Sequence, residues 1–221
     1  MKQNSPQLVS SYNSAKKAIL ILGSLSLLLA PLLTFIGWAI SHDSLTAFFN
    51  FNFSWTPTDG TVSMDKTNAM QIFRYYLLPH YFIYASMPFY ISLSLCLGYV
   101  LYRKAPWHVI IGVALAIIGA VYFIGVLGAF LSIPMGTVNV TSILKISFAL
   151  CIFVFVGNII QGFALLKSQV IPRWASILFI IGNVLILVFP GTENWMALGS
   201  AFMVIGMFPL SMKLFPKTNF K

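Results

Sequence analysis

The chain has 221 residues, of which 59% are hydrophobic and only 8% carry a charged side chain. Ordinary soluble domains carry about 25% charged residues, so this chain has too few charges to cover a water-soluble globule of its length. We therefore expect lipid to surround most of the polypeptide, which excludes the soluble fold classes.

Six apolar segments are long enough to form a spanning helix, which needs about 20 mainly apolar residues. Helices are expected because only helices and closed barrels satisfy their backbone polar groups in hydrocarbon, and the alternation typical of barrel strands is absent. The first apolar run is too long for a cleavable signal peptide. The sequence thus predicts an all-α integral membrane protein, a six-helix transmembrane bundle in one domain, with helices near 18–40, 77–101, 107–131, 143–166, 173–190 and 194–214.

The long connection at residues 41–76 separates the first two segments. Within it, FFNFNFSW at 48–55 alternates aromatic and polar side chains, which is strand periodicity. The pair Asp59-Gly60 follows as a turn signal, so a hairpin is expected. A short amphipathic helix, DKTNAMQIFRYY, would come next. We predict a small hairpin-plus-helix cap on the outer side of the membrane.

Tyrosines and basic residues crowd the stretch RYYLLPHYFIYASMPFY at 74–90. On a helix His80 and Tyr84 share a face, with Tyr81 three residues before Tyr84. Arg74, Lys145 and Glu193 are expected at a similar depth in the membrane. Together these residues would form an outward-open vestibule for an amphipathic molecule with an acidic or polar head. The alternative is an aromatic belt at the membrane surface. The candidate ligand-binding residues are Arg74, His80, Tyr81, Tyr84, Lys145 and Glu193.

The third segment carries small residues at helical spacing: Gly112, Ala116 and Ala120. Such rows let helices approach closely, so this helix is expected to be central. It is also a candidate contact for a homo-oligomer or another membrane protein, as is the outer loop at 41–76.

Polar side chains also lie within the fourth and fifth segments. Asn158 and Gln161 belong to a polar stripe of the fourth helix, and Asn183 lies at a similar expected depth on the fifth. One interpretation is a polar lining for a permeant or ligand. The alternative is an interhelical hydrogen bond between Asn158 and Asn183, worth about 0.6 kcal/mol.

Two of the expected turns have similar sequences, GYVLYRKAPW at 98–107 and GFALLKSQVIPRW at 162–174. One interpretation is a duplicated helical hairpin, related by an axis along the membrane normal. The other is convergence, because glycine, basic residues, proline and tryptophan all favour turns at a membrane surface.

The charges predict the orientation. With a cytoplasmic N-terminus, all four acids and three basic residues (Lys66, Arg74 and Lys145) fall outside. The other basic residues fall inside, as the positive-inside bias requires: Lys2, Lys16, Lys17, Arg103, Lys104, Lys167, Arg173, Lys213, Lys217 and Lys221. We expect both termini in the cytoplasm and a plasma membrane of the bacterial inner-membrane type. The net charge of +9 is then explained as a signal for insertion into the membrane. The expected partners are membrane lipids and not nucleic acid.

The sequence contains no recognisable catalytic, metal-binding or cofactor-binding motif. The expected spans contain no carboxylate, and the three histidines are dispersed. We therefore expect no cofactor and no metal. The favoured function is the binding or transport of a small lipophilic or amphipathic ligand. The alternatives are an accessory subunit of a membrane complex and, with the least support, an intramembrane enzyme.

Overall fold

The computed structural model describes residues 6–40, 70, 73, 78–132, 150–189 and 193–215. Within these residues the regular structure is entirely helical, which confirms the all-α prediction. The predicted hairpin at 48–62 lies outside the described residues. The six helices are α1 (Pro6–Ala39), α4 (Leu78–Leu101), α5 (Pro106–Ser132), α7 (Phe153–Ser168), α8 (Arg173–Val188) and α9 (Glu193–Leu214).

Four of these helices contain stretches long and apolar enough to cross a membrane: Ala18–Ala39, Leu78–Leu101, Pro106–Gly125 and Asn194–Leu214. Helices α7 and α8 have 16 residues each, or about 24 Å at 1.5 Å per residue, against a hydrocarbon core of about 30 Å. Upstream of α7, residues 150 and 151 are also helical, and Ile152 between them and the helix has α-helical dihedral angles. The composition and length of the four longer helices are compatible with membrane insertion.

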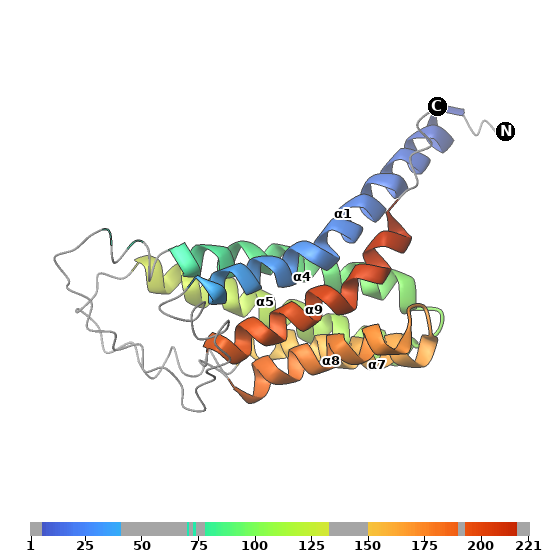
Figure 1. The fold of residues 1–221 in the computed structure, drawn as a ribbon. Helices are drawn as coiled ribbons and strands as arrows, with labels where there is room; N and C mark the ends of the chain where they lie inside the picture. Colours follow the sequence, from blue (N-terminus) through green and yellow to red (C-terminus); the bar gives the residue numbers. More distant parts are fainter. Residues whose placement is uncertain are drawn as a thin grey trace.

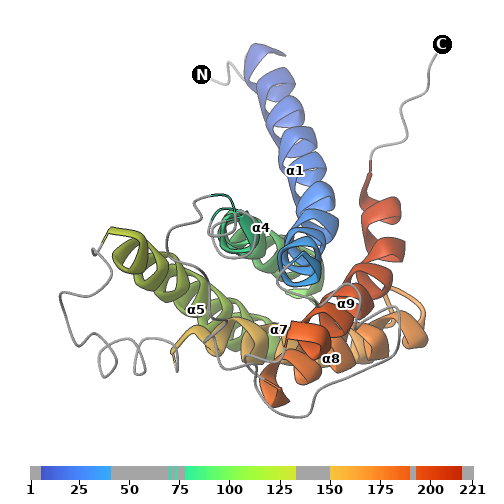
Figure 2. The same ribbon diagram turned by 60° about the vertical axis from the view of Figure 1, so that its left-hand side comes forward.

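The helices form a closed ring in which each packs against two neighbours. Around the ring the order is α1, α4, α5, α7, α8 and α9, and α9 packs back on α1. Among the described helices one further pair is in contact, α4 and α7, which lie on either side of α5 in the ring. Figures 1 and 2 show the bundle from two sides, with the N-terminal part of α1 projecting beyond its end. The ring gives the chain an inner face, which is where polar side chains acquire partners.

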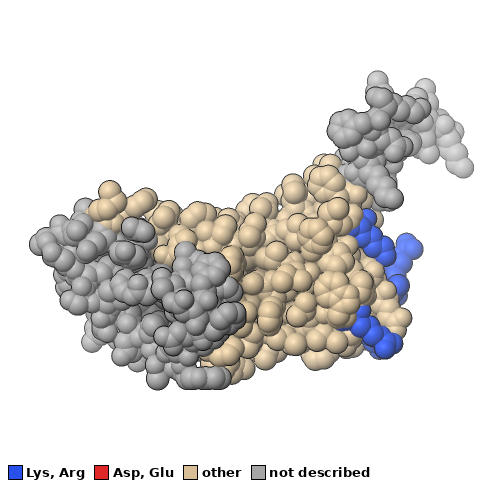
Figure 3. All heavy atoms as spheres, in the orientation of Figure 1, with Lys and Arg blue, Asp and Glu red and all other residues tan. Residues whose placement is uncertain are grey.

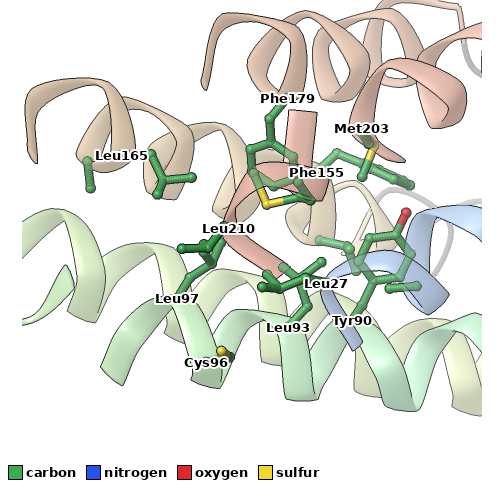
Figure 4. Close-up of a cluster of buried hydrophobic side chains, with 14 of the residues drawn as sticks. Leu27, Tyr90, Leu93, Cys96, Leu97, Phe155, Leu165, Phe179, Met203 and Leu210 are labelled. Atoms are coloured by element: carbon green, nitrogen blue, oxygen red, sulfur yellow. The ribbon is translucent and has the colours of Figure 1, made fainter. Parts of the chain in front are cut away.

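Large apolar side chains fill the interior (Figure 4). Tyr90 on α4 and Phe155 on α7 meet edge to face, with ring centroids 6.2 Å apart. Buried leucine, phenylalanine and methionine side chains from other helices surround them, among them Leu27, Leu93, Phe179, Met203 and Leu210. On the outer face of α5, by contrast, Ile110, Ile118 and Val121 are exposed. An apolar exterior of this kind is what lipid contact requires.

Glycines bring neighbouring backbones into contact at α5 and α7. A Cβ added to Gly157 would lie 2.5 Å from the carbonyl oxygen of Gly112 and 2.5 Å from the backbone nitrogen of Ala116. The small-residue row predicted on the third segment therefore packs against α7 of the same chain. A partner protein that docks on α5 would have to use another face of this helix.

The described basic side chains gather at one end of the bundle, where the turns at 102–105 and 169–172 lie (Figure 3). Two of them bind this end together. Lys104 donates from Nζ to the carbonyl oxygen of Ser168 at 3.0 Å, and Lys213 donates from Nζ to that of Val170 at 3.1 Å. Cations suit these positions because the last carbonyl groups of a helix such as α7 have no backbone N–H of a following turn from which to accept a hydrogen bond.

Candidate functional site

The predicted outer vestibule is described only in part. Arg74 and Lys145 lie outside the described residues, and Glu193 begins α9 but its side chain is not described. His80, Tyr81 and Tyr84 lie in the first two turns of α4.

Their exposure differs. Tyr81 is 54% exposed, whereas His80 and Tyr84 are half-buried. The Tyr84 hydroxyl is buried and has no hydrogen-bond partner among the described residues. Tyr81 thus has the exposure typical of an aromatic belt, and Tyr84 that of a residue facing the bundle.

Deeper in the bundle, a hydrogen bond joins the inner faces of α4 and α7. Gln161 donates from Nε2 to the hydroxyl of Ser94 at 2.5 Å, and both side chains are fully buried. The amide oxygen of Gln161 has no partner. This contact lies where α4 and α7, the two neighbours of α5, meet, so it places a polar group in the buried interior of the bundle.

Asn158 lies one turn along α7 from Gln161, toward the opposite end of the bundle from the basic side chains. Its side chain is 0% exposed, and neither its amide nitrogen nor its amide oxygen has a hydrogen-bond partner among the described residues. Burying an amide without a partner costs about 1–3 kcal/mol. An uncompensated amide at this position is therefore expensive for the fold, and such groups in native structures call for an explanation.

Asn183 lies at nearly the same level on α8. Gly162 of α7 packs against Ile180 and Phe179, and the antiparallel register then places Asn158 beside residues 183–184. Asn183 is fully buried, but its Nδ2 donates to the carbonyl oxygen of Phe179 in its own helix at 2.7 Å. Its amide oxygen is unpartnered. The hydrogen bond predicted between Asn158 and Asn183 is therefore not formed.

We call Ser94, Asn158, Gln161 and Asn183 the interior polar cluster. Asn158, Gln161 and Asn183 are polar residues that the sequence already predicted to lie within spans, whereas Ser94 is not among the predicted residues. Ser94 lies on the buried face of α4 together with Met87, Tyr90, Leu97 and Leu101. This heptad spacing was the signal that could have found it.

The chemistry available to the cluster is hydrogen bonding. Its members are neutral amides and a hydroxyl. These groups donate and accept hydrogen bonds, but they do not gain or lose a proton readily enough for acid–base catalysis. Among the described residues no three His, Cys, Asp or Glu side chains could together hold a metal ion. The geometry therefore defines a neutral polar site inside an apolar helical bundle.

Comparison with known proteins yields no relative: no family model, no curated protein and no solved structure matches this chain.

Proposed function

We propose that this protein binds, and passes across the membrane, a small amphipathic molecule that enters from an outward-facing vestibule and reaches the interior polar cluster. The observation that carries the proposal is Asn158, which is fully buried with neither amide atom hydrogen-bonded. A ligand with a polar head would supply the missing partners. The free amide oxygens of Gln161 and Asn183 would accept from a donor on the same head.

The order of residues along α4 supports a path from the vestibule. Tyr84, with its unpartnered hydroxyl, lies ten residues before Ser94, or about 15 Å along the helix axis. Between them Tyr90 accepts a hydrogen bond from Thr34 of α1 at 3.3 Å. Polar groups thus occur at three levels along α4, and the apolar side chains around Tyr90 and Ser94 suit the tail of an amphipath.

We further propose that all six helices span the membrane with both termini in the cytoplasm. Two observations support this topology. The α7–α8 hairpin occupies the ring between α5 and α9, which are themselves long enough to span. The turns at 102–105 and 169–172 lie at one end together with the described basic side chains (Figure 3). Because basic residues favour the cytoplasmic side of a membrane, we assign that end to the cytoplasm. We propose a plasma membrane of the bacterial inner-membrane type.

Photo-crosslinking tests the ligand site. The full chain in lipid nanodiscs is exposed to a photoactivatable long-chain fatty acid, and the labelled residues are mapped by mass spectrometry. We expect saturable labelling of inward-facing residues of α4 and α7, suppressed by excess unlabelled fatty acid and reduced at least tenfold in Asn158→Leu. Ile118→Leu, on the lipid-facing side of α5, is the control and should label like the wild type. Labelling confined to outer faces, without saturation, would refute the site.

Accessibility labelling tests the topology. A cysteine in place of Arg103 should react with a membrane-impermeant maleimide only when the reagent reaches the cytoplasmic side. A cysteine in place of His42 should react from the opposite side. Reaction of the residue-103 thiol from the exterior would overturn the orientation and, with it, the vestibule.

A further inference from the structure

A groove opens at the basic end of the bundle, away from the interior polar cluster. It has a volume of about 630 Å³ and is lined by the first turn of α5, the last turns of α7 and the start of α8. The volume falls in the range of about 300–1,000 Å³ typical of small-molecule sites. The lining residues are His108, Phe163, Leu166, Lys167, Gln169 and Arg173.

The groove is cationic, and none of its lining residues is acidic. Lys167 and Arg173 are exposed, and neither forms a side-chain hydrogen bond or ion pair with a described residue, unlike Lys104 and Lys213 nearby. The four acids of the chain are Asp43, Asp59, Asp65 and Glu193, none of which belongs to α5, α7, α8 or the turns between α4 and α5 and between α7 and α8. Two helices, α5 and α8, also begin here, and their amino-terminal ends favour an anion.

One wall of the groove is apolar. Phe163 precedes Lys167 by one turn of α7 and is 50% exposed, and Leu166 is half-buried beside it. Phe163 therefore lies about 6 Å further from the basic end than Lys167. The groove thus has a cationic mouth and an apolar side that continues toward the membrane, which matches a lipid and not a fully water-soluble anion.

Two exposed tryptophans mark the depth of the groove. Trp107 and Trp174 are 73% and 53% exposed, and they adjoin the lining residues His108 and Arg173 in the chain. Exposed tryptophans are enriched at the level of lipid headgroups. The groove therefore lies where the phosphate of a cytoplasmic-leaflet lipid would be found, if the proposed orientation holds.

The backbone at Gln169 points to the same groove. Gln169 ends α7 in the left-handed region (φ 52°, ψ 33°), and its backbone N–H bonds the carbonyl oxygen of Leu165 at 3.1 Å. Glycine is the usual residue at such a helix end, because other side chains are strained there. A glutamine here retains an amide that lines the groove and could donate to a phosphate oxygen.

We propose that this groove is a specific binding site for the phosphate headgroup of an anionic phospholipid, with Lys167, Arg173 and Gln169 on the headgroup and Phe163 against an acyl chain. Basic pockets between helices on the cytoplasmic side suit this class of ligand. The inference does not depend on the interior polar cluster, so the two sites fail or stand separately.

Native mass spectrometry of the full delipidated chain tests the proposal, with phosphatidylglycerol and phosphatidylcholine as probes. The wild type should prefer phosphatidylglycerol. The variant Lys167→Gln/Arg173→Gln should lose roughly thirty-fold in affinity for this lipid, because each cation near the headgroup is worth about fivefold. The control Arg103→Gln/Lys213→Gln removes the same charge at described residues that do not line the groove, and it should lose less than threefold.

Three results would overturn the proposal. A wild type that does not distinguish the two lipids has no anionic-lipid site, whatever the variants do. An equal loss in the groove and control variants would mean diffuse attraction by the net charge. Displacement of phosphatidylglycerol by inorganic phosphate at equal concentration would identify a free-phosphate site. The lipid proposal expects Phe163→Ala to weaken phosphatidylglycerol binding and to leave the weak binding of inorganic phosphate unchanged.

Discussion

Ser24 on α1 and Ser211 on α9 bind each other through reciprocal hydrogen bonds, although 187 positions separate them in the chain. The hydroxyl of Ser24 donates to the carbonyl oxygen of Ser211 at 2.9 Å, and the hydroxyl of Ser211 donates to that of Ser24 at 2.8 Å. Both side chains are buried. This pair joins the first and last helices and so closes the ring.

Removing either hydroxyl should loosen this closure. We expect Ser24→Ala and Ser211→Ala each to lower the free energy of unfolding by about 0.6 kcal/mol, the average for polar contacts between membrane helices. Denaturation with sodium dodecyl sulfate in mixed micelles measures the change. Ser26→Ala is the matched control, because the Ser26 hydroxyl donates only to the carbonyl oxygen of Leu22 in its own helix. Equal costs at Ser24 and Ser26 would show that the interhelical bonds add nothing.

Two glycines of α5 provide a matched pair for testing how closely α5 and α7 pack. A Cβ at Gly119 would collide with the backbone nitrogen of Val154 and lie 2.8 Å from the carbonyl carbon of Phe153, whereas a Cβ at Gly125 would meet nothing within 4 Å. We expect Gly119→Ala to destabilise the fold by about 1–3 kcal/mol, because backbone atoms cannot yield as a side chain can. Gly125→Ala should be neutral or stabilise slightly. The same unfolding titration compares them, and similar effects would contradict the close approach.

Asn158→Leu should separate function from stability. Leucine has the same branching as asparagine but no polar atoms, so it removes the cost of the unpartnered amide. We expect unfolding in micelles to require about 1–3 kcal/mol more free energy, while labelling by the fatty-acid probe falls. Gln161→Leu, which leaves the Ser94 hydroxyl without its partner, should not stabilise. A destabilised Asn158→Leu variant would indicate that the amide already has a partner in the folded protein.

The two cysteines should be protected from reagents in the folded state. Cys96 and Cys151 are both buried, with 8% and 4% exposure. A maleimide should leave both unmodified in membranes and modify both after denaturation, as counted by intact-protein mass spectrometry. The Arg103→Cys variant is the positive control and should gain one modification under native conditions. Rapid labelling of either native thiol would mean that its helix does not pack as described.

The helical nature of the described residues, and the suitability of several helices for a membrane, could be predicted from the amino-acid pattern alone. The physical reason is local: in hydrocarbon a segment must satisfy its own backbone groups, so a long apolar run already specifies a helix. The same pattern also located the buried amides Asn158, Gln161 and Asn183, because polar residues are rare within apolar runs.

Which polar residues contact each other could not be predicted before the helices were seen packed together. Gln161 binds Ser94 on α4, and Asn183 binds its own helix instead of Asn158. The groove at Lys167 and Arg173 likewise needs the ends of three helices to lie together. These outcomes depend on the order of helices around the ring and on their rotation. Helices that are apolar on all sides carry little sequence signal for either, because lipid and protein interior are equally apolar.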